Sequence, residues 1–146
     1  MNKSPKLNNL VRNLNTIASK VFGYSNQHAC AIVKNNRIIS IGTNKKVKRP
    51  LLRRLKYRNC WLHAEADAIL KAPKSDLKGA TLIVIRTGKT KLRNSKPCFP
   101  CQMLISEAGI GEVFFSTKDG TIEALRQMSE SGRNRLSEVV KGVKTR

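Results

Sequence analysis

The chain has 146 residues, of which 29 are Lys or Arg and 9 are Asp or Glu, so its formal net charge is +20. This length fits one domain that can bury a core without disulfide bonds or a structural metal, and the 40% hydrophobic content argues against a wholly disordered chain. The sequence has no run of 18 apolar residues and no apolar segment of a secretory signal, so we expect a cytosolic or nuclear protein and favour the cytoplasm. In such a reducing compartment, four cysteines indicate metal binding or catalysis more often than disulfide bonds.

The N-terminal third predicts a helix followed by a β-hairpin. Apolar residues recur every three or four positions over residues 7–21, which is the pattern of a helix with one apolar face. Residues 27–34 and 37–43 are rich in Ile, Val and Ala, which favours strands. The Asn35-Asn36 pair between them tolerates the positive φ of a tight turn, so we expect these strands to form a hairpin.

The elements that follow alternate between helices and strands. They are a helix over 63–71, an apolar strand over 79–86 that is typical of burial on both faces, a helix over 98–108 opened by Pro97, and a strand over 113–117. After this last strand, Asp119-Gly120 favours a hairpin turn, whereas Thr121 could cap a helix through Met128, and the sequence leaves both open. This order predicts a single sheet with helices packed on it.

Positive charge is concentrated in two stretches that contain no acid. Residues 45–58 and 86–96 together hold 13 of the 29 Lys and Arg residues, and no Asp or Glu precedes Glu65. Such clusters predict a surface that faces phosphate groups, although a solvated basic rim that only aids solubility is the alternative. The candidate phosphate or nucleic-acid contacts are Arg53, Arg54, Arg93 and Lys96.

Four residues in two motifs carry the chemistry of a metal site. Cys98 and Cys101 are three positions apart at a predicted helix start, where their sulfurs share one face and the helix dipole favours thiolates. His63 also begins a predicted helix, so the two helix N-termini could meet across a sheet edge, and His63 and Glu65 can reach one ion only from the first turn. Three protein ligands with one open position are typical of a catalytic zinc site.

Two other interpretations of these cysteines stay open. Cys60 and His63 form a CxxH motif that could join the CxxC motif in a closed, structural Cys3His zinc site, but this arrangement leaves Glu65 unexplained. A redox CxxC pair is the other interpretation, but the strand–CxxC–helix context of a thioredoxin fold does not explain His63 and Glu65.

The two motifs together resemble those of a known enzyme family. HAE at 63–65 and PCxxC at 97–101 match the HxE…PCxxC signature of zinc-dependent nucleobase deaminases, and the likeness extends over about 27–117. The chain is therefore similar to members of the cytidine/deoxycytidylate deaminase superfamily. This resemblance implies an α/β fold of three layers, with a five-stranded mixed sheet and helices on both faces, in a catalytic domain over 1–130. A basic C-terminal helix or tail would follow over 131–146.

The resemblance also implies the roles of the site residues. The zinc ion, Zn2+, is the cofactor that it implies, with His63, Cys98 and Cys101 as ligands and Glu65 as the proton shuttle. Zinc activates water near neutral pH, and the carboxylate beside it takes the water proton and delivers it to the ring nitrogen and the departing ammonia. The candidate substrate contacts are Asn44, which would touch the sugar, and Ala64, Trp61, Ser95 and Pro97.

Other residues near the motifs have structural interpretations. Asp67 is favoured in the first turn of a helix by the helix dipole, Cys30 lies in an apolar strand and is expected in the core, and His28 is expected to be a satisfied structural histidine. Trp61 and Phe99 flank the predicted ligands, where they could stack on a base or wall the core.

The sequence fits two enzymatic functions and one non-enzymatic function. The favoured substrate is a small cytosine nucleoside or nucleotide such as dCMP, whose phosphate the cations would bind. The alternative is cytosine or adenine within RNA or single-stranded DNA, where a basic groove would follow the backbone. An inactive zinc-bearing binding module is the third possibility, and the intact Glu65 argues against it. Relatives often associate, so we also expect a homo-oligomer, and we expect no membrane partner.

Overall fold

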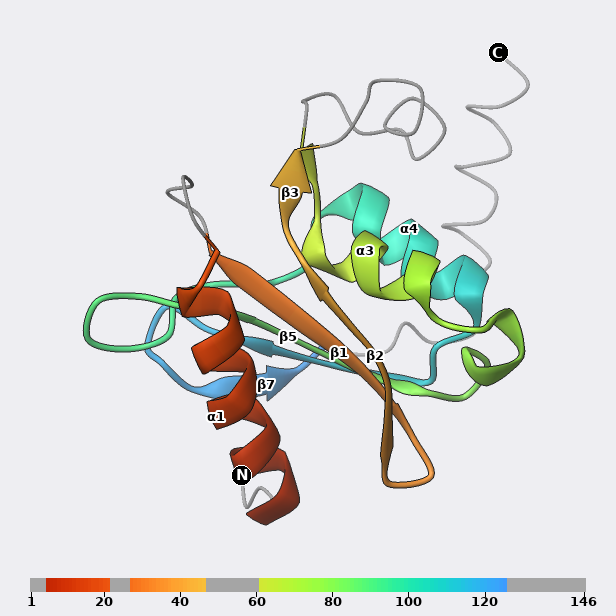
Figure 1. Cartoon of the computed structure of the whole chain (residues 1–146), viewed down its shortest axis with the longest axis horizontal. Helices are drawn as coiled ribbons and strands as arrows, with labels where there is room; N and C mark the ends of the chain where they lie inside the picture. The colour runs from red at the N-terminus through yellow and green to blue at the C-terminus, as the bar shows by residue number, and fades with distance from the viewer. Residues whose placement is uncertain (1–4, 22–26, 47–60, 126–146) are drawn as a thin grey trace.

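A computed structural model describes residues 5–21, 27–46 and 61–125 of the chain (Figure 1). The elements in chain order are α1 (Pro5–Ser19), β1 (His28–Lys34), β2 (Arg37–Thr43), β3 (Lys45–Lys46), β4 (Trp61–Leu62), α3 (Ala64–Lys71), the 3-10 helix η1 (Lys74–Asp76), β5 (Thr81–Arg86), α4 (Phe99–Ala108), β6 (Glu112–Ser116) and β7 (Ile122–Ala124). The predicted basic tail over 131–146 and most of the basic stretch over 45–58 lie outside the described residues. Among the helices of the described ranges, none has the length and apolar character needed to cross a membrane.

The strands form a five-stranded mixed sheet in the order β2-β1-β5-β6-β7. Strands β5 and β6 are parallel, and the other neighbouring pairs are antiparallel. Helix α1 covers one face of the sheet and helices α3 and α4 cover the other, as Figure 1 shows. This arrangement confirms the predicted three-layer α/β fold.

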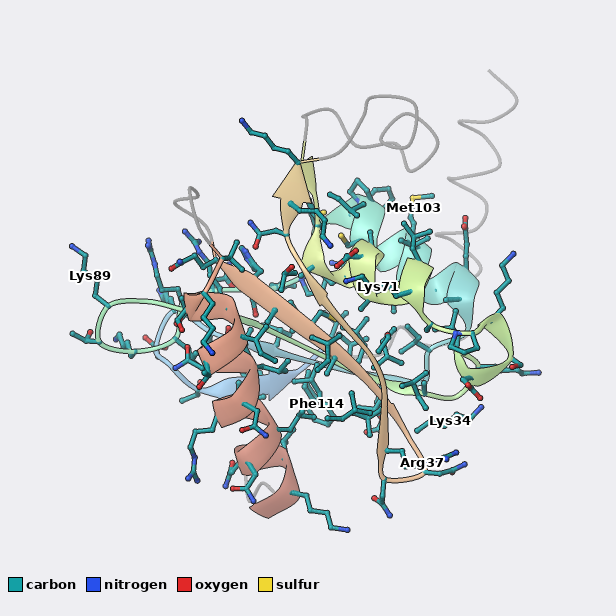
Figure 2. The ribbon with its side chains drawn as sticks, viewed as in Figure 1. Lys34, Arg37, Lys71, Lys89, Met103 and Phe114 are labelled. Carbon is teal, nitrogen blue, oxygen red and sulfur yellow. The ribbon has the colours of Figure 1, made fainter. Side chains whose placement is uncertain are left out.

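The alternation of side chains along β1 and β5 builds a separate core on each face of the sheet. In β5, Leu82 and Val84 pack into the cluster under α3 and α4, whereas Ile83 and Ile85 pack into the cluster under α1. In Figure 2 the labelled Phe114, which packs against the α1 cluster, lies on the same side of the sheet as α1. Burial on both faces explains why the strand reads as a continuous apolar run.

Local turn chemistry sets the two hairpins. Asn35 and Asn36 have φ values of 52° and 61°, so both occupy the left-handed region that the predicted β1–β2 turn requires. After β6, Gly120 adopts a φ of 84° and β7 pairs antiparallel with β6. Of the two alternatives that the sequence left open after the strand over 113–117, the structure shows the hairpin. The described residues that follow Thr121 form strand β7 and not a helix.

Two structural details next to the motifs differ from the predicted elements. The helices that carry the motifs begin one residue later than predicted, because His63 and Cys98 are the N-cap residues of α3 and α4. A short two-stranded ladder, in which Lys45 pairs with Leu62 and Lys46 with Trp61, was not predicted. This ladder joins the chain after β2 to the residues that immediately precede His63.

Candidate metal centre and active site

The structure brings His63, Cys98 and Cys101 together. His63 Nδ1 lies 3.4 Å from Cys98 Sγ and 3.3 Å from Cys101 Sγ, and the three candidate ligand atoms lie within 4.8 Å of one another. In tetrahedral coordination with Zn–S of about 2.3 Å and Zn–N of about 2.0–2.1 Å, neighbouring N and S ligands are about 3.5 Å apart. The observed spacing therefore fits one zinc ion. Among the described residues, His63, Cys98 and Cys101 are the group of three or more His, Cys, Asp or Glu side chains that lie close enough to hold a metal ion.

The ligand candidates stand at the N-termini of two helices that lie next to each other on the same face of the sheet. His63 and Cys98 are the N-caps of α3 and α4, and Cys101 is in the first turn of α4. Neither N-cap side chain makes a capping hydrogen bond to its own helix. Their polar atoms face each other instead, at the positive ends of two helix dipoles, which favour thiolate.

Electrostatics around the three side chains favour a deprotonated Cys98. Hydrogen bonds from Cys101 and from His63 lower the pKa of Cys98 to about 4, and they outweigh its partial burial. Burial disfavours the His63 imidazolium, but the neighbouring Cys98 sulfur raises the pKa of His63 overall. A thiolate is the form of cysteine that binds metals, so the site is prepared for a cation.

Glu65 lies in the first turn of α3 and is buried, with 5% of its surface exposed. Burial raises the pKa of Glu65, and contacts with backbone amides, His63 and Cys101 partly oppose this effect. A carboxyl group that is withdrawn from water and lies beside the metal-ligand candidates can hold and move a proton close to the metal.

Gly42 allows strand β2 to pack closely against α3. A Cβ atom at this position would lie 2.3 Å from the carbonyl oxygen of Ala64 and 2.4 Å from the backbone nitrogen of Ala68. Only glycine permits this approach, which sets the position of the helix that carries Glu65 and follows His63.

Asp67 ties the end of β2 to the same helix. Its Oδ2 atom accepts a hydrogen bond from the Thr43 backbone N–H at 3.1 Å, and it forms ion pairs with Lys45 at 3.1 Å and Lys71 at 2.9 Å. Figure 2 labels Lys71 on α3. The sequence suggested only a dipole interaction for Asp67, because its partner Thr43 is 24 residues away along the chain.

Asn44 and His28 lie together at the start of β1. The His28 backbone N–H donates to Asn44 Oδ1 at 2.9 Å, and Asn44 is buried. Burial, with the charges of Arg86 and His63, lowers the pKa of His28 to about 4, so its imidazole is neutral at physiological pH. The predicted sugar contact of Asn44 stays a prediction, and the structure adds that this side chain also fixes the strand end.

Ser95 and Ser116 form a buried hydroxyl network just before the PCxxC motif. The two Oγ atoms are 2.8 Å apart, and Ser95 Oγ donates to the Val84 carbonyl at 2.9 Å and accepts the Ser116 backbone N–H at 2.8 Å. The Ser95 backbone N–H donates to the Ser116 carbonyl at 2.8 Å. The Ser95 hydroxyl therefore fastens the loop before α4 to β5 and β6, and Ser116, which the sequence analysis did not single out, is its partner. A polar residue that ends the strand VFFS was the available signal.

The other predicted contacts are placed as follows. Ala64 and Pro97 are buried, Arg93 and Lys96 are exposed, and Trp61 contributes its backbone to β4. Cys30 is fully buried in the core, and 51% of Phe99 is exposed at the start of α4. Arg53, Arg54 and Cys60 lie outside the described residues, so the substrate contacts and the closed Cys3His alternative stay predictions.

With this geometry in view, comparison with known proteins decides the family. The sequence profile of the cytidine and deoxycytidylate deaminase zinc-binding region matches residues 6–117. The chain belongs to this family. Its zinc-binding character and the His-Cys-Cys group of the structure confirm the predicted cofactor, Zn2+.

Two curated relatives are similar to parts of the chain. The riboflavin biosynthesis protein RibD of Actinobacillus pleuropneumoniae is 29% identical over 136 residues, which cover 87% of the chain. The deoxycytidylate deaminase of Mycobacterium phage D29 is 41% identical over 54 residues, which cover 37% of the chain. The matched segments span 30% and 35% of these relatives' own lengths.

Solved structures show the same fold. The dCMP deaminase of cyanophage S-TIM5, in complex with dCMP and dUMP, has a TM-score of 0.58 at 21% identity and covers 80% of this chain and 85% of its own. A cytidine deaminase from Burkholderia pseudomallei also has a TM-score of 0.58, at 18% identity, with 81% and 90% covered. A diaminohydroxyphosphoribosylaminopyrimidine deaminase and reductase from Thermotoga maritima has a TM-score of 0.53 at 28% identity, with 77% and 30% covered.

Proposed function

We propose that the protein is a zinc-dependent hydrolytic deaminase that converts cytosine to uracil in a small nucleoside or nucleotide such as dCMP. The observation that carries this proposal is the group of three ligand atoms within 4.8 Å, with the buried Glu65 in the first turn of the helix that follows His63. His63, Cys98 and Cys101 would hold the zinc ion, and with three protein ligands the ion would remain open to water or substrate.

The residues of the chain divide the chemistry between them. Bound zinc supplies the Lewis acidity that makes water nucleophilic near neutral pH. Glu65 accepts the proton of the attacking water and delivers it to the ring nitrogen, and then assists the departure of ammonia. Its burial keeps solvent away from the proton during these transfers, while Gly42 and Asp67 hold α3 and therefore Glu65 in place.

The relatives support a small pyrimidine nucleotide as substrate. The phage D29 protein is a deoxycytidylate deaminase, and the cyanophage enzyme was solved with dCMP and dUMP. The Thermotoga maritima protein is named for a phosphoribosylated aminopyrimidine. These three names describe free pyrimidine compounds that carry a phosphate, and the Burkholderia pseudomallei enzyme is named for the nucleoside cytidine, so all four favour a small substrate over cytosine within a polynucleotide.

Product analysis tests the proposal. Purified protein is incubated with cytidine, deoxycytidine, dCMP and a cytosine-containing oligonucleotide, and uracil products are measured beside the zinc content. We expect about one zinc per chain and uracil formation from a small substrate. The Glu65→Gln variant should retain its zinc and lose at least roughly 10²–10⁴ in turnover, while Glu123→Gln, an exposed residue of β7, should retain both. Wild-type turnover by Glu65→Gln would exclude the proposed mechanism, and deamination of the oligonucleotide alone would exclude the proposed substrate.

Two cysteine substitutions test the ligand set. Cys98→Ala should abolish stoichiometric zinc binding, because it removes one of three protein ligands. Cys60→Ser should leave the zinc in place, since Cys60 is a ligand only in the closed Cys3His arrangement. Full zinc content in Cys98→Ala, or loss of zinc in Cys60→Ser, would show that the proposed ligand set is wrong.

A further inference from the structure

Three side chains from three strand segments lie in a row on the zinc face of the sheet. His28 pairs with Arg86 across β1 and β5, and Arg86 pairs with Arg93 across an isolated antiparallel bridge. Directly paired residues of antiparallel strands project to the same face. Arg86 follows Leu82 and Val84 at steps of two, and both of these pack under α3 and α4, so the row faces the same side of the sheet as the metal centre.

The position of Arg93 is fixed by its neighbours. Leu92 packs into the core cluster on the α1 side, so the alternation of side chains turns Arg93 to the opposite face. A Cβ atom at Gly88 would lie 2.8 Å from Cγ and 3.1 Å from Cδ of Arg93. The stem of this arginine therefore lies against the backbone of Gly88, although the residue as a whole is exposed.

One buried hydroxyl holds the two arginine backbones in place. Ser116 is fully buried, and its Oγ atom accepts the Arg86 backbone N–H at 3.0 Å and donates to the Arg93 carbonyl at 2.6 Å. The Arg93 backbone N–H donates in turn to the Arg86 carbonyl at 2.8 Å. The two arginines are thus held as neighbours by the backbone, which is the preorganisation that a binding site needs.

The positive charges of Arg86 and Arg93 repel each other, because the two residues are directly paired. Burial and the charge of Arg93 lower the pKa of Arg86. His28, the third member of the row, is neutral at physiological pH and therefore adds no charge, and its pKa responds to both Arg86 and His63. An anion bound between the guanidinium groups would offset their repulsion and could accept bidentate hydrogen bonds from each.

We propose that Arg86 and Arg93, next to His28 on the face of the sheet that carries the metal centre, form an anion subsite that binds the phosphate monoester of a nucleotide substrate. This inference rests on the proposed deaminase function and specifies its substrate class as a nucleoside monophosphate rather than a nucleoside. Arg93 is one of the phosphate contacts predicted from the sequence, and the structure adds Arg86 and the Ser116 hydroxyl that positions the pair.

The test compares dCMP with deoxycytidine, which differ only by the phosphate. Replacing Arg93 with glutamine should lower kcat/KM for dCMP by roughly 10–100-fold through KM, because a hydrogen bond to a charged group is lost. The loss on deoxycytidine should be much smaller, because this compound has no phosphate for Arg93 to contact. Arg86→Gln should act in the same direction, and Arg93→Lys should recover part of the loss because it restores the charge without the bidentate geometry.

Arg37→Gln is the matched control. Arg37 is an exposed arginine that begins β2 directly after the Asn35-Asn36 turn, at the far end of β1 from His28, and Figure 2 labels it there. This variant loses the same charge and should treat both substrates as the wild type does. An unchanged preference for dCMP in Arg93→Gln, or an equal loss on both substrates, would overturn the anion subsite.

A binding measurement separates this inference from the proposed function. Titration calorimetry with dCMP, deoxycytidine and inorganic phosphate on the zinc-loaded Glu65→Gln variant requires no turnover. We expect dCMP to bind more tightly than deoxycytidine, and this difference to shrink when Arg93→Gln is added. If the wild type deaminates neither compound but the difference is seen, the proposed function fails and the subsite stands. If dCMP binds no more tightly than deoxycytidine while Arg93→Gln weakens binding of an oligonucleotide, the site holds a polynucleotide backbone and the inference is wrong.

Discussion

Replacement of Gly42 by alanine forces strand β2 and helix α3 apart. The added Cβ would lie 2.3 Å from the Ala64 carbonyl oxygen, whereas ordinary contact begins at 3.4 Å, so a separation of 3.4 − 2.3 = 1.1 Å must be gained. The obstacle is helix backbone rather than a flexible side chain. The helix as a unit must therefore retreat, and it takes His63 and Glu65 with it.

Such a displacement is large for a metal site. Ligand distances in such a site hold to about 0.2 Å, and a misplacement of about 1 Å in a catalytic group can cost about 10²-fold in rate. Overpacking of this kind also lowers the free energy of unfolding by about 1–3 kcal/mol. We therefore expect Gly42→Ala to lose zinc affinity, turnover and stability together.

Zinc titration, dCMP turnover and urea unfolding of Gly42→Ala measure the three effects. Gly111→Ala is the matched control, because a Cβ at Gly111 would meet the nearest backbone atom at 3.4 Å, which is ordinary contact. It should change the unfolding free energy by no more than about 0.5 kcal/mol. If Gly42→Ala retained the zinc affinity, turnover and urea midpoint of the wild type, the close packing of β2 would not be what positions α3.

Two further predictions concern the residues around this contact. Asp67→Ala should lower the free energy of unfolding by about 1–3 kcal/mol, because it leaves the Thr43 N–H without its acceptor, and Asp67→Asn should recover part of this loss. Urea unfolding measures both, with the exposed Asp119→Asn as control, and equal stability of all variants would contradict the anchoring role. The pKa of His28 is lowered from 6.5 to about 4 in the folded protein. Between pH 6.5 and 4, His28 is therefore protonated in the unfolded state but neutral in the folded state. The contribution of neutral His28 to the free energy of unfolding is therefore fully present above pH 6.5. Between pH 6.5 and 4 the free energy of unfolding of the wild type should fall by up to about 3 kcal/mol more than that of His28→Gln, and by less if water reaches the ring. Parallel pH profiles of the two proteins would refute a neutral, buried His28.

Local sequence signals account for most of the fold. The apolar periodicity of α1, the Asn35-Asn36 turn and the continuous apolar run of β5 each act within one element, and each prediction was confirmed. The segment after β6 was ambiguous because Asp119-Gly120 suits a turn and Thr121 suits a helix cap. Pairing across the sheet, with Phe114 opposite Ala124, decided it, and that contact is not encoded in the local pattern.

The candidate site shows the same difference between features that local sequence signals predict and features that depend on contacts between distant parts of the chain. HAE and PCxxC each lie at a predicted helix start, which indicated that their side chains could meet, and the resemblance to the deaminases then implied the ligand set. The residues that support them were missed or assigned other roles, since their partners lie far along the chain: Asp67 bonds to Thr43 across 24 positions and Ser95 to Ser116 across 21. Ser95 was predicted as a substrate contact from its place before PCxxC, and the structure shows its hydroxyl within a buried network.

The two helix starts show how stability and chemistry are divided in this fold. Ser, Thr, Asp or Asn at an N-cap would stabilise each helix by about 0.5–2 kcal/mol, but the N-cap residues of α3 and α4 are His63 and Cys98, whose side chains make no capping hydrogen bond. Their polar atoms face each other at 3.4 Å instead. The contacts that hold these uncapped helix starts come from other elements: Gly42 and Asp67 fasten α3 to β2, and the Ser95–Ser116 network fastens the segment before α4 to the sheet. Because these contacts lie outside the candidate metal centre, the side chains of His63 and Cys98 need not cap their own helices, and both helix dipoles favour thiolate at the two helix starts.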